Sequence, residues 1–344
     1  IYMGIWFPDM PQWVWALSSI ILMGLINMIA VRLFGEFEFW FSLIKVVAII
    51  ALIAMGAAVV FFGFTNDWVP LGFDNLWIHG GFFPNGIGGL LMSLQMVLFA
   101  YVGIEMIGLS AGEAENPKKT IPMAIDSLAW RILIFYMGAI LVILAIFPWN
   151  EVGQQGSPFV VMFERLGLRE AAGIVNFVVI TAALSSCNAG IFSGGRLLYS
   201  LSINGYAPEK FAHLSESGVP HRAVMAAVMV PMIGVVLNYF VPDKAFQYVM
   251  AAVTFIGLMV WIAILYTQMR FRKSLTPAQA KSLSYRTPWW PYSSWFALAF
   301  IVLVIVLMGF HEDARAALIL GPCLLVVYCA MYYVLGLHRK NKLK

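Results

Sequence analysis

The sequence has few charged residues: Asp, Glu, Lys and Arg make up 11% of its 344 residues, whereas hydrophobic residues make up 62%. A soluble domain typically carries about a quarter charged residues, so a soluble fold of this length could not cover its apolar surface with polar side chains. A lipid bilayer removes that requirement because hydrocarbon becomes the outer solvent. The scarcity of charge therefore excludes a soluble fold and predicts a membrane protein.

Cysteine is scarce as well. Cys187, Cys323 and Cys329 are the three in the sequence, and they show neither metal-ligand spacing nor a disulfide framework. The five histidines show no ligand spacing either, so we expect no metal and no other cofactor. A basic patch with base-stacking aromatic residues, the pattern of nucleic-acid binding, is also missing. Nucleic acid is therefore not an expected partner.

What the sequence does contain is long stretches without charge. Nine of them run for at least 19 residues without Asp, Glu, Lys or Arg, and a spanning helix needs about 20 apolar residues. The sequence therefore predicts an all-α polytopic membrane protein, with one transmembrane domain over residues 1–344. The nine predicted spans lie near 13–34, 39–62, 88–110, 127–147, 171–200, 223–241, 246–269, 294–311 and 315–337.

The basic residues predict the orientation of these spans. Of the 21 Lys and Arg, sixteen follow spans one, three, five and seven or lie in the C-terminal tail, and four lie on the opposite side. The positive-inside rule places the larger group, and with it the C-terminus, in the cytoplasm. The chain begins at Ile1 without a Met or a signal-like segment. We therefore expect an N-terminal part of the natural protein to precede it.

Lys45 is an ionisable residue inside the second predicted span. Charged groups within a bilayer are costly and usually face a cavity or a partner. A desolvated lysine gives up its proton more readily, so Lys45 is a candidate coupling site for a proton-driven carrier. Because it lies only a turn or two into the span, its ammonium could instead reach the membrane interface along its own aliphatic chain.

Glu105 is the second intramembrane charge, at the end of the run Phe99–Glu105. Gly103 in this run costs a helix about 1 kcal/mol relative to Ala. An interrupted helix would present backbone N–H and C=O groups that bind the carboxylate and ammonium of an amino acid, as in known transporters. Alternatively, Gly103 allows close helix packing and Glu105 pairs with a neighbouring helix.

The fifth predicted span contains Ser185, Ser186 and Asn188 among small residues. These side chains could line a substrate or ion site, or simply let helices approach closely. A separate amphipathic run over 159–168 follows Ser157 and Pro158, a favourable start for a helix. It predicts a short helix at the outer surface, which is either a lid or a plain interfacial helix.

Four stretches of the sequence resemble the bacterial amino acid permeases: Gly35–Lys45, Phe99–Glu105, Gly112–Pro122 and Trp130–Tyr136. These permeases form the amino acid transporter (AAT) family of the amino acid–polyamine–organocation (APC) superfamily. The chain looks closest to the permeases for proline, histidine and aromatic or other neutral amino acids. The resemblance implies a leucine-transporter-like, inverted-repeat fold of twelve helices. The nine predicted spans would match family helices 4–12, with the first three absent.

The resemblance also implies roles for the residues noted above. It makes the substrate site the unwound stretch of the sixth family helix, formed here by Phe99, Ala100, Tyr101, Val102, Gly103 and Glu105. The carbonyls near Phe99 and Val102 would accept from the substrate ammonium, and Phe99 and Tyr101 would contact its side chain.

A second implied site concerns ion coupling. Lys45 matches a fifth-helix lysine that occupies the place of a sodium ion in proton-coupled relatives. Ser185 and Ser186 match the eighth-helix residues facing it, and Asn188 is a possible pocket-lining residue.

These observations together predict secondary transport of an amino acid across a bacterial inner membrane. The protein would work by alternating access, and proton symport would drive the transport. An exchanger without ion coupling and a sensor built on a transporter fold are the alternatives. An enzyme is not expected, because catalysis needs clustered reactive groups and the spans offer only isolated charges.

Overall fold

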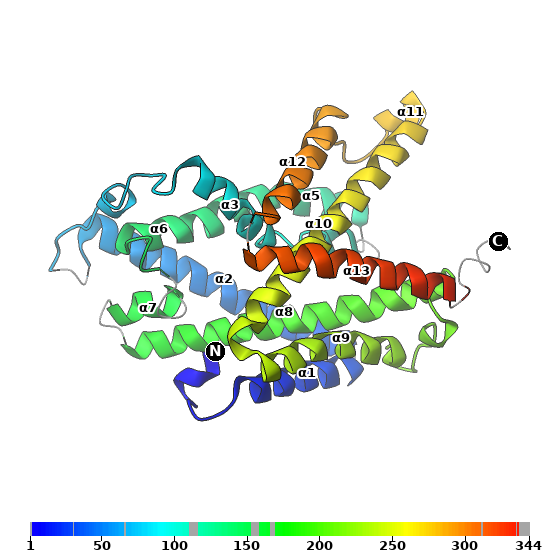
Figure 1. Ribbon diagram of the computed structural model, residues 1–344, viewed down its shortest axis with the longest axis horizontal. Helices are drawn as coiled ribbons and strands as arrows, with labels where there is room; N and C mark the ends of the chain where they lie inside the picture. The colour runs from blue at the N-terminus through cyan, green and yellow to red at the C-terminus, as the bar shows by residue number, and fades with distance from the viewer. Residues whose placement is uncertain are drawn as a thin grey trace. The chain divides into compact units, whose positions relative to one another are not determined.

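The computed structural model describes residues 2–29, 31–64, 67–109, 116–152, 158–165, 169–310, 312–334 and 336. These residues form helices joined by turns, with no strand among them (Figure 1). In the described part, seven helices are long and apolar enough to cross a membrane, and Gly86–Phe99 and Tyr292–Met308 are shorter apolar helices. The predicted all-helical fold class is confirmed.

The chain divides into two compact units. The first contains the described residues of Ile1–Pro84 and Ala129–Pro242. Helix α8 packs against four other helices of this unit, α1, α2, α7 and α9, and so positions most of its buried polar side chains. The helices are α1 (Gln12–Ile29), α2 (Val31–Phe62), α6 (Gly138–Ile146), α7 (Pro158–Arg165), α8 (Arg169–Ile203) and α9 (His221–Phe240), with 3-10 turns at Tyr2–Ile5, Asp74–Leu76 and Glu209–Phe211.

The second unit contains the described residues of Asn85–Leu128 and Asp243–Val334. Its buried core joins α10, α12 and α13 through apolar side chains that include Phe255, Leu258 and Val304, and Leu98 of α3 packs against it. The helices are α3 (Gly86–Phe99), α4 (Met106–Leu109), α5 (Pro117–Arg131), which runs on into the first unit, α10 (Pro242–Ser274), α11 (Pro277–Lys281), α12 (Tyr292–Met308) and α13 (Glu312–Val334).

Within the described residues, helices cover the main part of each of the nine predicted ranges. The helix at the fourth predicted range begins with α5 at Pro117, ten positions before the predicted 127. A π-helical turn over Ile132–Met137 connects α5 to α6. The prediction followed the charge-free interval, which marks hydrocarbon depth only. A proline is well accommodated in the first turn of a helix, so α5 extends into polar sequence beyond that depth.

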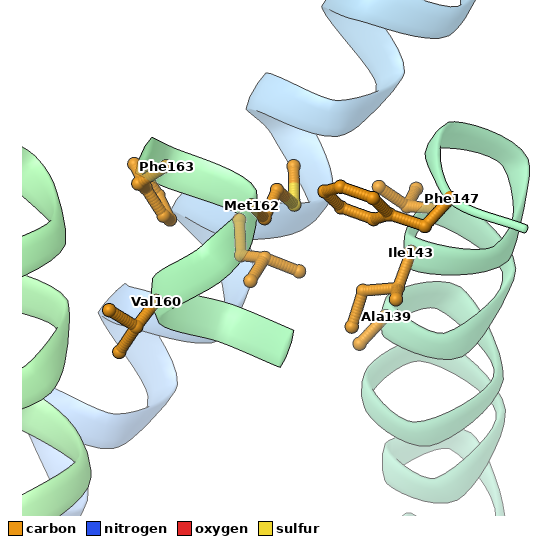
Figure 2. Close-up of a cluster of buried hydrophobic side chains, with 8 residues drawn as sticks. Ala139, Ile143, Phe147, Val160, Met162 and Phe163 are labelled. Atoms are coloured by element: carbon orange, nitrogen blue, oxygen red, sulfur yellow. The ribbon is translucent and has the colours of Figure 1, made fainter. Parts of the chain in front are cut away.

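Helix α7 is packed into a core rather than lying apart from it. Val160, Met162 and Phe163 of α7 are buried in one cluster with Ile143 of α6 and with Phe147, the residue that caps the C-terminus of α6. Figure 2 shows Met162 pointing toward Phe147. The predicted short helix is therefore present over Pro158–Arg165, and its apolar face is buried by protein. Ser157, its predicted N-cap, lies outside the described residues.

Candidate functional site

The third apolar helix is interrupted. Helix α3 ends at Phe99 and α4 begins at Met106, with a series of turns between them. Gly103 has φ of +108°, a conformation that residues with a Cβ rarely adopt. A Cβ at Gly103 would meet no atom within 4 Å, so the glycine is required by the backbone conformation rather than by close packing.

The Glu105 carboxylate stabilises this break through two hydrogen bonds. Its Oε2 atom accepts a hydrogen bond from the backbone N–H of Gly103 at 3.0 Å and another from the indole Nε1–H of Trp261, on α10, at 3.1 Å. The acid therefore satisfies a backbone donor at the break and also connects the break to a neighbouring helix. The two interpretations of Glu105 offered by the sequence are not exclusive, because both geometries occur at once.

The backbone of the break presents an acceptor for a ligand. The Phe99 carbonyl accepts from the Val102 N–H at 3.1 Å, whereas no donor among the described residues reaches the Val102 carbonyl. A carbonyl oxygen has two lone pairs, so both carbonyls have capacity to bind an ammonium group. Phe99 and Tyr101 are half-buried and Ala100 is exposed.

The Val102 side chain makes a second contact between the break and α10. It packs against Gly257 of α10, where a Cβ would lie 3.0 Å from Val102 Cγ2. Gly257 and Trp261 are one turn apart on α10, so a single face of this helix contacts the break twice. Trp261 thus joins the candidate site, although no sequence pattern indicated it.

In the first unit, Lys45 belongs to a chain of hydrogen bonds. Its Nζ donates to Ser185 Oγ at 2.8 Å, and Ser185 Oγ donates to Glu38 Oε1 at 2.7 Å. The Lys45 Nζ atom lies 3.9 Å from the same Glu38 oxygen, and both charged side chains are 28% exposed. Lys45 is thus paired within the protein with Ser185 and Glu38.

The two predicted partners of Lys45 on α8, Ser185 and Ser186, lie on different faces of the helix. Ser185 is fully buried, whereas Ser186 is exposed and its hydroxyl donates to the Ala182 carbonyl at 3.1 Å. Adjacent residues of an α-helix point about 100° apart, so only one of the two serines can face α2. The structure therefore brings Ser185, and not Ser186, to Lys45.

Asn188 is fully buried on the same helix. Its Oδ1 accepts from Asn27 Nδ2 of α1 at 2.8 Å, so this pair connects α1 to α8. Within the described part of the chain, Asn188 Nδ2 and Asn27 Oδ1 have no hydrogen-bond partner. Asn188 is therefore buried between helices, and its observed contact is with Asn27 of α1.

Two further residues of these clusters, Glu38 and Asn27, are recognisable from the sequence. Glu38 precedes Lys45 by seven positions, which is two helical turns and places both on one face. The predicted span began at 39, so Glu38 fell just outside it. Asn27 is an isolated polar residue within an apolar span, a position that usually has a partner.

In the residues that the structure describes, no group of three or more His, Cys, Asp or Glu could hold a metal ion. The break belongs to the second unit and the Lys45 cluster to the first. Each is an arrangement of hydrogen-bonding groups within its own unit.

Apolar helices of membrane-spanning length, together with a shorter apolar helix interrupted beside a charged residue, are the features of a polytopic membrane transporter. The family model for amino acid permeases matches residues 1–344. The chain belongs to the amino acid permease family.

Curated relatives share most of the sequence. An uncharacterized amino acid permease of Bacillus subtilis (strain 168), YtnA, is 50% identical over 341 residues, which cover 99% of this chain and 74% of the relative. A probable threonine/serine transporter of the same organism, YbxG, is 45% identical over the same coverage. The amino-acid permease AapA is 41% identical over 334 residues, covering 97% of this chain and 72% of AapA.

Proposed function

We propose that this protein is a secondary transporter that moves a neutral amino acid across the bacterial inner membrane by alternating access, with a proton as the coupling ion. The observation that carries the proposal is the break between Phe99 and Met106, where Gly103 leaves the helical conformation and Glu105 satisfies the backbone. Discontinuous membrane helices bind the charged ends of small substrates in transporters. In this proposal the C-terminus is cytoplasmic, and the distribution of Lys and Arg supports that orientation.

The proposed substrate site is the stretch Phe99–Glu105. The Val102 carbonyl, which has no donor among the described residues, would accept a hydrogen bond from the substrate ammonium. The half-buried rings of Phe99 and Tyr101 would contact the substrate side chain. Glu105 is already engaged by Gly103 and Trp261, so its role is to shape the break rather than to bind the substrate directly.

The proposed coupling site is Lys45 with Ser185. In this proposal Lys45 carries the coupling proton, and the buried Ser185 hydroxyl, 2.8 Å from Lys45 Nζ, supplies a hydrogen-bonded path to it. Ser186, exposed on another face of α8, supports the packing of its own helix in this proposal.

The experiment is an uptake assay with radiolabelled amino acids in cells that express the full-length gene. The panel starts with threonine and serine, because the relative YbxG is named for them, and continues with proline, histidine and the aromatic amino acids. We expect uptake of at least one neutral amino acid above vector controls, and accumulation that rises as the external medium is acidified. Absence of uptake for the whole panel would overturn the proposal.

An exchanger without ion coupling is the second candidate, since the Lys45–Glu38 pair could simply neutralise two charges within the membrane. Addition of a protonophore discriminates between the two. Collapse of accumulation with intact counterflow exchange supports proton coupling, whereas unchanged steady-state levels support exchange alone.

A further inference from the structure

Glu38 is the charged residue of the Lys45 cluster to which the function proposed above assigns no role. Its side chain lies on α2, two helical turns before Lys45, and its Oε1 atom accepts hydrogen bonds from Ser185 at 2.7 Å and from Ser42 at 3.4 Å. The other carboxylate oxygen, Oε2, is buried and has no hydrogen-bond partner in the described residues. A carboxylate oxygen offers two lone pairs, so Glu38 has capacity to accept a proton.

The three side chains form a continuous path of short contacts. Lys45 Nζ, Ser185 Oγ and Glu38 Oε1 are joined by successive hydrogen bonds of 2.8 and 2.7 Å, each pointing from Lys45 toward Glu38. A serine hydroxyl both donates and accepts, so it can pass a proton along without changing its own charge. Ser185 is fully buried, which keeps bulk water from replacing it in the path.

The path also has a direction along the helix. Seven residues of α-helix rise about 10 Å, so Glu38 lies nearer than Lys45 to the N-terminal end of α2. The distribution of basic residues places that end at the cytoplasmic side. Glu38 therefore lies between Lys45 and the cytoplasm.

We propose that Glu38 and Ser185 form the route by which the proton carried by Lys45 leaves toward the cytoplasm; this inference rests on the function proposed above. The Lys45 ammonium gives one proton to Ser185 Oγ while the Ser185 hydroxyl proton moves to Glu38 Oε1. The ammonium becomes an amine, the carboxylate becomes a carboxylic acid, and Ser185 regains its hydroxyl. Glu38 then releases the proton to cytoplasmic water and becomes a carboxylate again. The Lys45 amine takes up the next proton from the external water in the outward-facing state, so one proton crosses per cycle.

Few other charged groups face this path. Among the described side chains, the helices packed against α2 are α1 and α6, which carry no charged residue, and α8. Helix α8 carries Arg196, whose guanidinium lies 4.7 Å from the Phe192 ring centroid and, by helical rise, about 16 Å along the axis from Ser185. The titratable Cys187 and Tyr199 are also on α8, and Glu36 is exposed on α2 itself. Within this set, Glu38 alone contacts both Lys45 and Ser185.

The test uses the full-length permease reconstituted into proteoliposomes, with the membrane potential clamped by valinomycin and equal potassium on both sides. The probe is radiolabelled L-threonine or, if the wild type does not take it up, the panel amino acid that it takes up fastest. A pH gradient of about one unit then supports up to about tenfold accumulation for one proton per substrate. Counterflow exchange without a gradient is measured on the same preparations.

We expect Glu38→Gln to reach only equal concentrations inside and outside while it retains counterflow exchange, because the amide cannot accept the proton. Glu38→Asp keeps a carboxyl group and should restore accumulation in part. Glu36→Gln, an exposed acid two positions away, is the matched control and should behave as the wild type. Ser185→Ala, which removes the bridging hydroxyl, should slow gradient-driven uptake more than exchange and replaces Glu38→Gln if that variant does not fold.

Two results would overturn the relay. Wild-type accumulation by Glu38→Gln would exclude the carboxyl group from the proton path, and a parallel loss of exchange and accumulation would make Glu38 a structural partner of Lys45. Failure of the proposed function is distinguishable from both, because the wild type itself would then exchange its substrate without accumulating it.

Discussion

Glu105 and Trp261 are joined by a hydrogen bond of 3.1 Å, although they are 156 positions apart in the sequence. The same carboxylate oxygen accepts from the Gly103 backbone N–H. One atom therefore stabilises the interrupted backbone and attaches it to α10. This arrangement explains how a helix can be broken at membrane depth, where an unsatisfied backbone group would be costly.

Replacement of Glu105 should destabilise the break. In Glu105→Ala, the Gly103 N–H and the Trp261 indole lose their common acceptor, and a buried donor left unsatisfied costs about 1–3 kcal/mol. We expect a lower apparent melting temperature of the detergent-solubilised full-length protein and a loss of uptake. Glu216→Ala, at an exposed acid in a loop, is the control. A melting temperature equal to that of this control would contradict the role of Glu105.

The Trp261 contact can be removed without removing its ring. Trp261→Phe lacks the indole N–H, so it should lose a hydrogen bond to a charged acceptor, about 1–3 kcal/mol, while Gly103 retains its acceptor. In the double variant with Glu105→Ala, the second substitution should add little, because both remove the same interaction. Fully additive losses of thermal stability would refute the coupling. Trp289→Phe, at a residue that is 86% exposed, controls for the loss of an indole.

The backbone requirement for glycine at position 103 can be tested separately from side-chain packing. A Cβ at this position meets no atom within 4 Å, so Gly103→Ala adds no overlap. It does force φ of +108° on a residue with a Cβ, at a cost of about 1–3 kcal/mol. We expect reduced uptake and stability. Gly108→Ala, also with open space around its Cβ but within the helix α4, should be neutral or stabilising, because Ala is the better helix former; an equal loss of stability in the two variants would disprove the argument.

The sequence predicted the positions of the helices well because hydrocarbon depth fixes their length and charge marks their ends. The sequence left two interpretations open for Gly103, a helix break and close helix packing, and the φ of +108° with open space around its Cβ favours the break. The partners were not predictable in the same way. Trp261 and Asn27 come close to Glu105 and Asn188 only through packing of distant helices, and no local pattern indicates which of the 12 tryptophans turns its N–H inward.

Which of the two neighbouring serines, Ser185 or Ser186, faces Lys45 could not be predicted from the sequence. The sequence presents Ser185 and Ser186 as equivalent, and the resemblance to permeases assigned both to the coupling site. The rotation of α8 decides between them, because it buries the first and exposes the second. That rotation is set by contacts along the whole helix with α1, α2, α7 and α9, which the sequence does not reveal.

Gly321 tests the packing of the second unit. A Cβ on Gly321 of α13 would overlap the ring of Phe255, a buried residue of α10. Overpacking of this kind costs about 1–3 kcal/mol, so Gly321→Ala should lower the apparent melting temperature. Phe255→Leu should recover part of that loss in the double variant. Gly234→Ala, with open space around its Cβ, serves as the control, and an equal melting temperature for the two alanine variants would contradict the predicted overlap.

Lys45 offers the most direct test of proton coupling. Lys45→Arg retains a positive charge beside Glu38, but a guanidinium does not release its proton in proteins. We therefore expect Lys45→Arg to keep counterflow exchange and to lose accumulation driven by a pH gradient. Lys45→Ala should lose accumulation as well, and should also be less stable, because removal of one partner leaves Glu38 without its counter-ion. Lys244→Ala, at an exposed lysine, is the control, and pH-driven accumulation that survives in Lys45→Arg would assign the coupling proton to another group.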